Sequence, residues 1–407
     1  MTAPIQVFDV PSLEFYKLDN IREALQKLDN PQFGRRCILV AGTNAKGSVV
    51  SYLSELFQLT GKKIGSYYSP HIESECERIQ INSDLIPEEE LQRLRLKHET
   101  VLKPLTYFEQ MTCLAFVYFR EQKVDLQVLE VGMGGRLDAT NLSDPDYSVI
   151  TSVGLDHEEV LGKGESAIAR EKSGIMRKRK GRPVWVAGSL SGLAQESCRE
   201  VAREVGAELR SLSSAILPEV IIKQINSELR DRGDFQIQNA KLALALFLEA
   251  CRDWNWEQSD FPKNIFRKAR LKGRCQILSQ FPLVVIDGAH NVEAVRALDN
   301  FLELNFPNQK FTAVFGVMNE KDPIPLLEVL RSRIKALCLP DFYPPRQMSK
   351  EKLAKLIEES SLDVGPVVIE MDLGAGLRRL KDGGESLLAF GSFYLAGQMI
   401  RLSQGDR

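Results

Sequence analysis

A glycine-rich segment near the N-terminus has the composition of a phosphate-binding loop. It lies between a short apolar run and a predicted helix and reads Gly42-Thr43-Asn44-Ala45-Lys46-Gly47-Ser48. The backbone N–H groups of such a loop, with the N-terminus of the following helix, can bind phosphate oxygens. Lys46 would reach the terminal phosphates, and the Ser48 hydroxyl would bind phosphate or metal. The strict G-x-x-x-x-G-K-[ST] pattern is not met, because residue 40 is valine and Gly47 follows the lysine. A tight turn with a solvent-exposed lysine is the alternative.

A glutamate stands at the end of an apolar run further along the chain. Glu130 follows Leu126-Gln127-Val128-Leu129 and is soon followed by Gly132-Met133-Gly134-Gly135. A carboxylate at the end of a buried strand is costly unless it is paired or bound to metal. Ligands of open α/β sheets collect at the carboxyl ends of strands, and Mg²⁺ prefers oxygen ligands. Glu130 is therefore a candidate magnesium ligand, and a salt bridge to Arg136 is the alternative.

Three of the four histidines follow predicted strands. His157 would emerge at the same edge of the sheet as Glu130, and His290 belongs to the segment 287–291, Asp-Gly-Ala-His-Asn, in the second half of the chain. A hydrogen-bonded loop histidine and an ordinary Asp-Gly turn are the structural alternatives. The functional interpretation is a second set of polar groups that complements the first site.

Strands and helices alternate along the chain, which predicts parallel sheets covered by helices on both faces. The predicted strands of the first block are Ile38–Ala41, Lys63–Tyr68, Asp125–Val131, Tyr147–Val153 and Pro183–Ala187. Its predicted helices are Val49–Gln58, Phe108–Arg120, Glu165–Met176 and Gln238–Cys251. After a polar stretch at 253–272, strands are predicted at Leu283–Ile286, Thr312–Phe315, Ala336–Leu339, Val367–Glu370 and Leu387–Phe390. We predict an α/β protein with a larger P-loop-type ATP-binding domain, 1–270, and a smaller Rossmann-like domain, 271–407.

Composition narrows the class of protein. The 407 residues exceed what one hydrophobic core usually supports. A net charge of −2 gives no general attraction to nucleic acid or anionic membrane. The basic run at 177–180 is interpreted as a solvent-exposed helix cap. Seven scattered cysteines without a C-x-x-C pair indicate reduced thiols. Without a signal peptide or an apolar run of about 18 residues, we expect a cytoplasmic monomer with small-molecule partners.

Ten segments together resemble the folylpolyglutamate synthase/dihydrofolate synthase family, a branch of the Mur ligase superfamily. They occur in the family's order, at about its spacings, and cover nearly the whole chain. They are GTNAKGS (42–48), YYSPHI (67–72), ERIQIN (77–82), TYFE (106–109), LEVGMGGRLDATN (129–141), ITSVGLDHEEVLG (150–162), IAREKSGI (168–175), QIQNAKLAL (236–244), DGAHN (287–291) and GSFYLAG (391–397).

The resemblance implies an ATP- and Mg²⁺-dependent ligase that joins L-glutamate to dihydropteroate or to folate glutamate tails through an acyl phosphate. It assigns the metal to Ser69, Glu130 and His157. It assigns nucleotide contacts to 42–48, Asn239, Arg274 and Asp287. It assigns the pterin to Phe108, Asp138, Ala139 and Thr140, and the phosphate and glutamate to His290 and Ser392. Catalytic roles fall to Lys46, His290 and Lys172, the last matching a lysine that is carbamylated in the family.

Two departures from the family pattern bear on the site. Ala45 stands where the family usually has glycine, and a positive φ there would strain the loop. Phe235 stands where the family often has histidine, which would remove one polar contact near the nucleotide. Two rival functions remain open, another Mur-type ligase that makes a cell-wall or storage peptide, and a non-catalytic nucleotide-binding protein.

Overall fold

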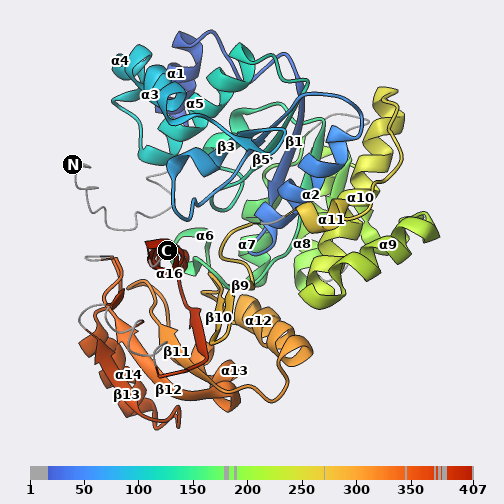
Figure 1. The fold of residues 1–407 in the computed structure, drawn as a ribbon. Helices are drawn as coiled ribbons and strands as arrows, with labels where there is room; N and C mark the ends of the chain where they lie inside the picture. The colour runs from blue at the N-terminus through green and yellow to red at the C-terminus, as the bar shows by residue number, and fades with distance from the viewer. Residues whose placement is uncertain are drawn as a thin grey trace. The chain divides into compact units, whose positions relative to one another are not determined.

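The chain forms two compact units in a computed structural model that describes residues 17–177, 183–187, 190–269, 271–343, 346–370, 373–374, 377 and 383–405 (Figure 1). The larger unit contains the described residues up to Arg230 and from Asp234 to Ala269. The smaller unit contains Asp231–Gly233 and the described residues from Leu271 onward.

The larger unit is built on a mainly parallel sheet of eight strands in the order β4-β3-β2-β5-β1-β6-β7-β8. The six strands β2-β5-β1-β6-β7-β8 pair in parallel in this order. Strands β3 and β4 extend the sheet beyond β2 and pair antiparallel. The strands are β1 (Arg36–Ala41), β2 (Ile64–Tyr67), β3 (Ile79–Ile81), β4 (Asp84–Leu85), β5 (Leu126–Glu130), β6 (Tyr147–Ile150), β7 (Val184–Val186) and β8 (Leu209–Ser211).

Helices cover both faces of this sheet, because its central strands are apolar on both sides. In β1 the side chains of Cys37, Leu39 and Ala41 join one buried cluster, while Ile38 and Val40 are equally buried on the opposite face. The helices are α1 (Asp19–Lys27), α2 (Lys46–Gln58), α3 (Glu88–Lys97), α4 (Glu99–Leu102), α5 (Tyr107–Glu121), α6 (Glu158–Leu161), α7 (Gly164–Ser173), α8 (Gly192–Val205), α9 (Glu219–Leu229), α10 (Asp234–Trp254) and α11 (Ile265–Lys268).

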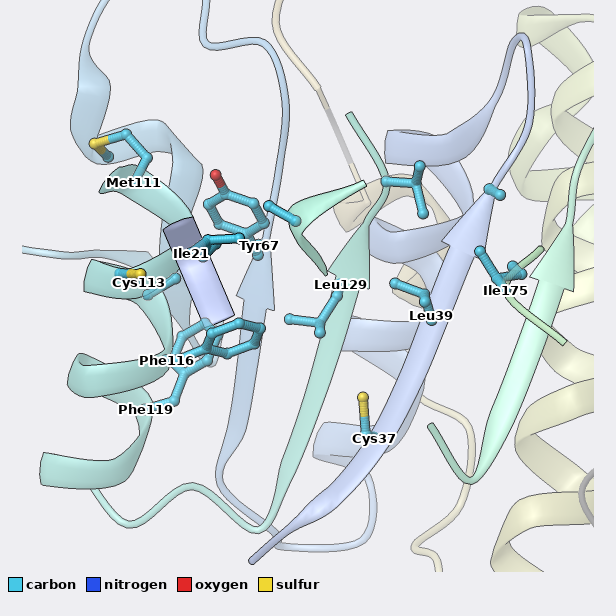
Figure 2. Close-up of a cluster of buried hydrophobic side chains, with 14 of the residues drawn as sticks. Ile21, Cys37, Leu39, Tyr67, Met111, Cys113, Phe116, Phe119, Leu129 and Ile175 are labelled. Carbon is cyan, nitrogen blue, oxygen red and sulfur yellow. The ribbon is translucent and has the colours of Figure 1, made fainter. Parts of the chain in front are cut away.

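Aromatic side chains of α5 fill the first of these faces. Figure 2 shows Phe116 and Phe119 packed toward Leu129 of β5, with Tyr67 of β2 beside them. The other face is covered by α2 and α10, which run along each other and meet through the edge-to-face pair Phe57–Phe247, with ring centroids 5.0 Å apart. The strands that end at the site are therefore fixed from both sides.

The smaller unit repeats the design with six strands in the order β13-β12-β11-β14-β10-β9. All neighbours pair in parallel except β9, which is antiparallel to β10. The strands are β9 (Gln276–Gln280), β10 (Leu283–Ile286), β11 (Phe311–Phe315), β12 (Ile334–Pro340), β13 (Val367–Glu370) and β14 (Leu387–Phe390). The main helices are α12 (Val292–Asn305), α13 (Ile324–Leu330), α14 (Lys350–Ser360) and α16 (Phe393–Gly405).

The predicted α/β class is confirmed, with two differences in detail. The antiparallel strands β3, β4 and β9 and the parallel edge strand β8 were not predicted, because they are short or alternate with exposed polar residues. The solvent-exposed cap predicted at 177–180 is wrong for Arg177, whose Nη2 donates to the carbonyl oxygens of Asn141 and Ser143 at 2.7 and 3.1 Å. Residues 178–180 lie outside the described residues. No described helix combines the length and the hydropathy that a bilayer crossing requires.

Candidate functional site

Four parallel strands of the larger unit end at one edge of the sheet, where the predicted site residues follow them. The strands lie side by side in the order β2-β5-β1-β6. Val40 of β1 pairs with Glu130 of β5, and Ala41 pairs with Ile150 of β6. The phosphate loop therefore begins between the carboxylate at the end of β5 and the segment that leads from β6 to His157.

The segment after β6 holds the phosphate loop in place. The backbone N–H of Thr43 donates to the Ser152 carbonyl at 3.0 Å, and that of Asn44 donates to the Ser152 hydroxyl at 2.7 Å. The Thr43 hydroxyl donates to the Gly154 carbonyl at 3.1 Å. A Cβ atom at Gly42 would lie 1.9 Å from the Thr151 hydroxyl, so this close approach requires glycine.

The loop leads into the N-terminus of helix α2, a position that favours the binding of an anion. Helix α2 starts at Lys46, and its N-cap residue Ala45 provides no side-chain hydrogen bond to the first turn. The first N–H groups of a helix have no partner within the helix, and its dipole adds positive potential there. The Lys46 ammonium folds back over the loop and donates to the carbonyls of Gly42 and Thr43 at 3.0 and 3.2 Å. Lys46 thus lies over the loop and does not extend into solvent.

Helix α10 reaches the phosphate loop through a glutamine. Gln236 Nε2 lies 3.4 Å from the Ser48 hydroxyl, and its Oε1 accepts from the Tyr52 hydroxyl at 3.1 Å. Asn239, one turn further along α10, is buried. The sequence had singled out Asn239 only by resemblance, and Gln236 had no assigned role. No local pattern could have found this contact, because 188 positions separate Gln236 from Ser48.

Two predicted metal ligands are brought together at the ends of β2 and β5. The Ser69 N–H donates to Glu130 Oε2 at 3.0 Å, and Glu130 is only 3% exposed. The alternative salt bridge between Glu130 and Arg136 is wrong, since Arg136 pairs with Glu171 at 2.9 Å. Ser69 and Glu130 are thus neighbours, and a serine hydroxyl and a carboxylate are oxygen donors of the type that Mg²⁺ prefers.

His157, the third predicted ligand, caps α6 in a left-handed backbone conformation with φ of 56°. Its ring nitrogens lie 3.9 Å from Asp156 Oδ1 and 3.6 Å from Glu159 Oε1. The described residues contain no cluster of three His, Cys, Asp or Glu side chains that could hold a metal. A Ser–Glu–His set supplies only two such side chains, so its role as a metal site stays a prediction.

Lys172 is buried in α7, next to the glycine-rich loop that follows Glu130. It is 3% exposed, which excludes an ordinary helix-surface lysine. A Cβ atom at Gly135 would lie 2.8 Å from the Lys172 carbonyl and 2.9 Å from the Glu171 carbonyl. The glycine therefore lets the loop pack directly on the backbone of α7.

Asp138 holds the other end of this loop. Its Oδ2 accepts from the N–H groups of Gly132 and Met133 at 2.9 and 3.0 Å, and its Oδ1 accepts from the Thr140 N–H at 2.9 Å and hydroxyl at 2.5 Å. Burial raises the pKa of Asp138, and these hydrogen bonds oppose that shift. Ala139 and Thr140 are buried in the turn that follows. The predicted pterin residue Asp138 is thus the anchor of its own loop.

Phe108 completes this group from the first turn of α5. A Cβ atom at Gly132 would lie 2.6 Å from the Phe108 ring, so ring and loop are in close contact. The position of the ring is set by a capping box, in which Thr106 and Glu109 each accept a hydrogen bond from the other's backbone N–H. The T-x-x-E spacing of the TYFE segment is the sequence pattern of such a capping box.

The smaller unit gathers its predicted residues around Phe393. The Arg274 guanidinium lies 4.4 Å from the centre of the Phe393 ring, and the His290 ring meets it edge-on at 5.5 Å. A Cβ atom at Gly288 would lie 2.1 Å from the same ring. Ser392 is 3% exposed, and its hydroxyl accepts from the Tyr394 N–H at 3.1 Å. Phe393 itself was not among the predicted residues.

Asp287 is buried beneath this cluster. Its carboxylate accepts from the N–H groups of Cys275 and Ala289 at 2.6 and 2.7 Å. Burial raises the pKa of Asp287, while the nearby Arg274 guanidinium lowers it. His290 Nδ1 lies 2.8 Å from the Gly288 carbonyl, a contact that helps to fix the orientation of the ring.

Ala45 has the positive φ, 66°, that the family's glycine would adopt without strain. Ala45→Gly is expected to raise the free energy of unfolding by about 1 kcal/mol, because a left-handed L-residue costs about 1–2 kcal/mol. It should also tighten the binding of a non-hydrolysable ATP analogue severalfold. Urea unfolding followed by tryptophan fluorescence measures the first effect, since Trp185, Trp254 and Trp256 all lie in the larger unit.

Ala167→Gly is the matched control for this prediction. Ala167 lies inside α7, where glycine should lower the free energy of unfolding by about 1 kcal/mol. If Ala45→Gly and Ala167→Gly lowered the free energy of unfolding equally, the backbone at Ala45 would carry no strain.

Comparison with known proteins agrees with this geometry. The Mur ligase middle domain matches residues 40–247, and the Mur ligase glutamate ligase domain matches residues 273–393. The dihydrofolate synthase/folylpolyglutamate synthase of Buchnera aphidicola is 30% identical over 404 residues, covering 95% of this chain and 94% of the relative.

Solved structures show the same likeness. Mycobacterium tuberculosis folylpolyglutamate synthase, complexed with ADP and AMPPCP, superposes with a TM-score of 0.83 at 26% identity, covering 97% of this chain and 95% of that one. Escherichia coli FolC, in complex with DHPP and ADP, gives 0.79 at 27% identity, covering 99% and 95%. The chain belongs to the folylpolyglutamate synthase/dihydrofolate synthase family of Mur ligases.

Proposed function

We propose that this protein is an ATP-dependent ligase that joins L-glutamate to dihydropteroate and to the γ-carboxylate of folate glutamate tails. One observation carries the proposal. The phosphate loop with Lys46 lies at the same sheet edge as the adjacent Ser69 and Glu130, in a chain of this family. A nucleotide phosphate and its metal ion would both find ligands there.

The chemistry explains why such a site is needed. A carboxylate is a poor electrophile, so an oxygen of the acceptor attacks the γ-phosphorus of ATP, ADP leaves, and an acyl phosphate forms. The glutamate amine then attacks the acyl carbon, inorganic phosphate leaves with the former carboxylate oxygen, and the amine gives up a proton. Bringing two anions together requires positive charge, which Lys46 and the N-terminus of α2 provide.

The remaining predicted residues take their roles by resemblance. Ser69, Glu130 and His157 would hold Mg²⁺, which when bound neutralises phosphate charge. We propose that Lys172 is carbamylated, so that the buried side chain becomes an anion. Asn239, Arg274 and Asp287 would contact the nucleotide, and His290 and Ser392 would orient phosphate and glutamate. Phe108 and the loop held by Asp138 would bind the pterin, which favours dihydropteroate as an acceptor.

We further propose that the enzyme works as a monomer in the cytosol on small molecules alone. All seven cysteines are free thiols, six of them buried, which suits a reducing compartment. The net charge of −2 provides no general attraction for nucleic acid.

Incorporation of labelled L-glutamate into product is the direct test of the function. With ATP and Mg²⁺, we expect incorporation into dihydropteroate and into tetrahydrofolate, with one ADP and one phosphate released per amide bond. A UDP-linked peptide acceptor should give none. Preference for that acceptor would point to a cell-wall ligase, and nucleotide binding without product would point to a non-catalytic protein.

Glu130→Gln and Lys46→Ala are each expected to lower kcat by at least about a hundredfold. Lys46→Ala removes a positive charge that stabilises the transferring phosphoryl group, and Glu130→Gln removes a proposed ligand of the metal ion that neutralises phosphate charge. Both variants should keep the native circular dichroism spectrum. Asp125→Asn is the control, since Asp125 precedes the same strand β5 at its opposite end and accepts from the Lys63 N–H at 2.8 Å. Near-normal turnover of Glu130→Gln would exclude Glu130 from the metal site.

Lys172→Ala is expected to lose activity, and a short carboxylic acid such as acetate should restore part of it. The added carboxylate would occupy the space of the missing carbamate and replace its charge. Lys172→Arg, which keeps the cation but cannot be carbamylated, should be inactive and should not respond to acetate. Full activity of Lys172→Ala without acetate would contradict the carbamate proposal.

A further inference from the structure

The loop that follows β12 lies at the carboxyl edge of the smaller sheet. Strands β12, β11, β14 and β10 are parallel neighbours, so the segments after them share this edge, including His290 after β10 and Ser392 after β14. Ligands of such sheets collect at the carboxyl ends of strands. The described residues of the segment after β12, 341–343 and 346–347, had no assigned role.

This loop is tightly framed. Gln347 is 5% exposed, its Oε1 accepts from the N–H groups of Phe342 and Tyr343, and its Nε2 donates to Asp341 at 2.9 Å. The Phe342 ring fills the space above Gly316, where a Cβ atom would lie 2.3 Å from it. Gln398 of α16 donates to the Phe342 carbonyl. Gln347, Gly316 and α16 therefore hold the Phe342–Tyr343 part of this loop in place.

This loop presents a cation, Arg346, that forms no ion pair with the described residues. Arg346 is exposed, its N–H donates to the Tyr343 carbonyl at 3.1 Å, and its own carbonyl accepts from the Asn319 N–H at 3.1 Å. Its guanidinium forms no ion pair with any carboxylate of the described residues. By contrast, the nearby Lys350 pairs with Asp341. The backbone of Arg346 is fixed while its charge stays available.

Stacked phenols connect Arg346 with Ser392. The rings of Tyr343 and Tyr394 stack with centroids 4.0 Å apart and an interplanar angle of 13°. The Arg346 N–H donates to the Tyr343 carbonyl at 3.1 Å, and the Tyr394 N–H donates to the Ser392 hydroxyl at 3.1 Å. Ser392 immediately precedes the 13-residue helix α16, whose N-terminus adds positive potential. A guanidinium, two phenols and a helix N-terminus thus share one patch.

We propose that Arg346, with the Tyr343–Tyr394 pair, binds the side-chain carboxylate of the incoming glutamate. This inference rests on the proposed function and extends it to a specificity-determining residue. A guanidinium binds a carboxylate through two parallel hydrogen bonds, and no neutral amide of the same shape can replace that charge. Glutamine or alanine in place of glutamate would leave the guanidinium without an anion, and the enzyme would discriminate against them.

Arg346→Gln tests the proposal in the full-length enzyme. We expect the KM for L-glutamate to rise by at least about tenfold, since the substitution removes the charge that the substrate carboxylate would bind. The KM values for ATP and for the pterin acceptor should stay within about twofold. The preference for L-glutamate over L-glutamine should fall, and Arg346→Lys should recover part of the affinity.

Arg331→Gln is the matched control. Arg331 is exposed and precedes the same strand β12 at its opposite end, so its loss should leave all three KM values unchanged. An unchanged KM for glutamate in Arg346→Gln would overturn the proposal. A second result would also overturn it, namely an equal rise of all three KM values in both Arg346→Gln and Arg346→Lys while both variants keep native thermal melts. The residue would then support the structure of the site as a whole and would not bind glutamate specifically.

Failure of the proposed function would look different. If the wild-type enzyme formed no glutamate amide, titration calorimetry with L-glutamate would still measure binding to this patch. Binding that Arg346→Gln weakens and Arg331→Gln does not would support the subsite without the ligase activity. Equal binding by both variants, or none by the wild type, would overturn it.

Discussion

The hydrogen bonds between the phosphate loop and the segment after β6 are the constraint on which the larger unit depends. Thr43 and Asn44 both donate to Ser152, and Thr43 also bonds Gly154. These bonds join the ends of two adjacent strands and fix where α2 begins. Lys46, Ser48 and the N–H groups of the first helical turn then take their positions from this arrangement. The strained φ of Ala45 persists because the flanking contacts determine the path of the loop.

Buried carboxylates likewise fix the neighbouring loops through hydrogen bonds. Glu130 accepts from the Ser69 N–H, and Asp138 accepts four hydrogen bonds within its own loop. A carboxylate in such a place must be satisfied, since an uncompensated buried charge is very costly. Each one therefore sets the geometry of a loop at the same sheet edge, and glycines allow these loops to pack against Phe108 and α7.

In the smaller unit, buried polar side chains also fix the loops at the carboxyl edge of the sheet. A buried aspartate, Asp287, orders the segment after β10, and Phe393 gathers Arg274 and His290 above it. The loop after β12 is framed by Gln347 so that Arg346 projects from fixed backbone. A preorganised cation of this kind would bind an anion with little loss of conformational freedom, as the proposed glutamate subsite requires.

The sequence by itself determined the α/β class, the turn between β1 and α2 that carries the predicted phosphate loop, and the approximate limits of most central strands. Strands β10 and β14 begin and end where the apolar runs do, because strands buried on both faces have continuous apolar sequences. It also contained the Thr106–Glu109 capping box, which is a local signal.

Only the tertiary structure decided which loops meet. The strand order places β5 beside β1 and β1 beside β6, and that order is not encoded in any local pattern. The packing of the chain brings Glu130 next to Ser69 and pairs Arg136 with Glu171. It also places Gln236 against Ser48, which lies 188 positions away in the sequence. The physical reason is that such contacts depend on how helices and strands pack, a property of the whole chain that spacing along the sequence does not specify.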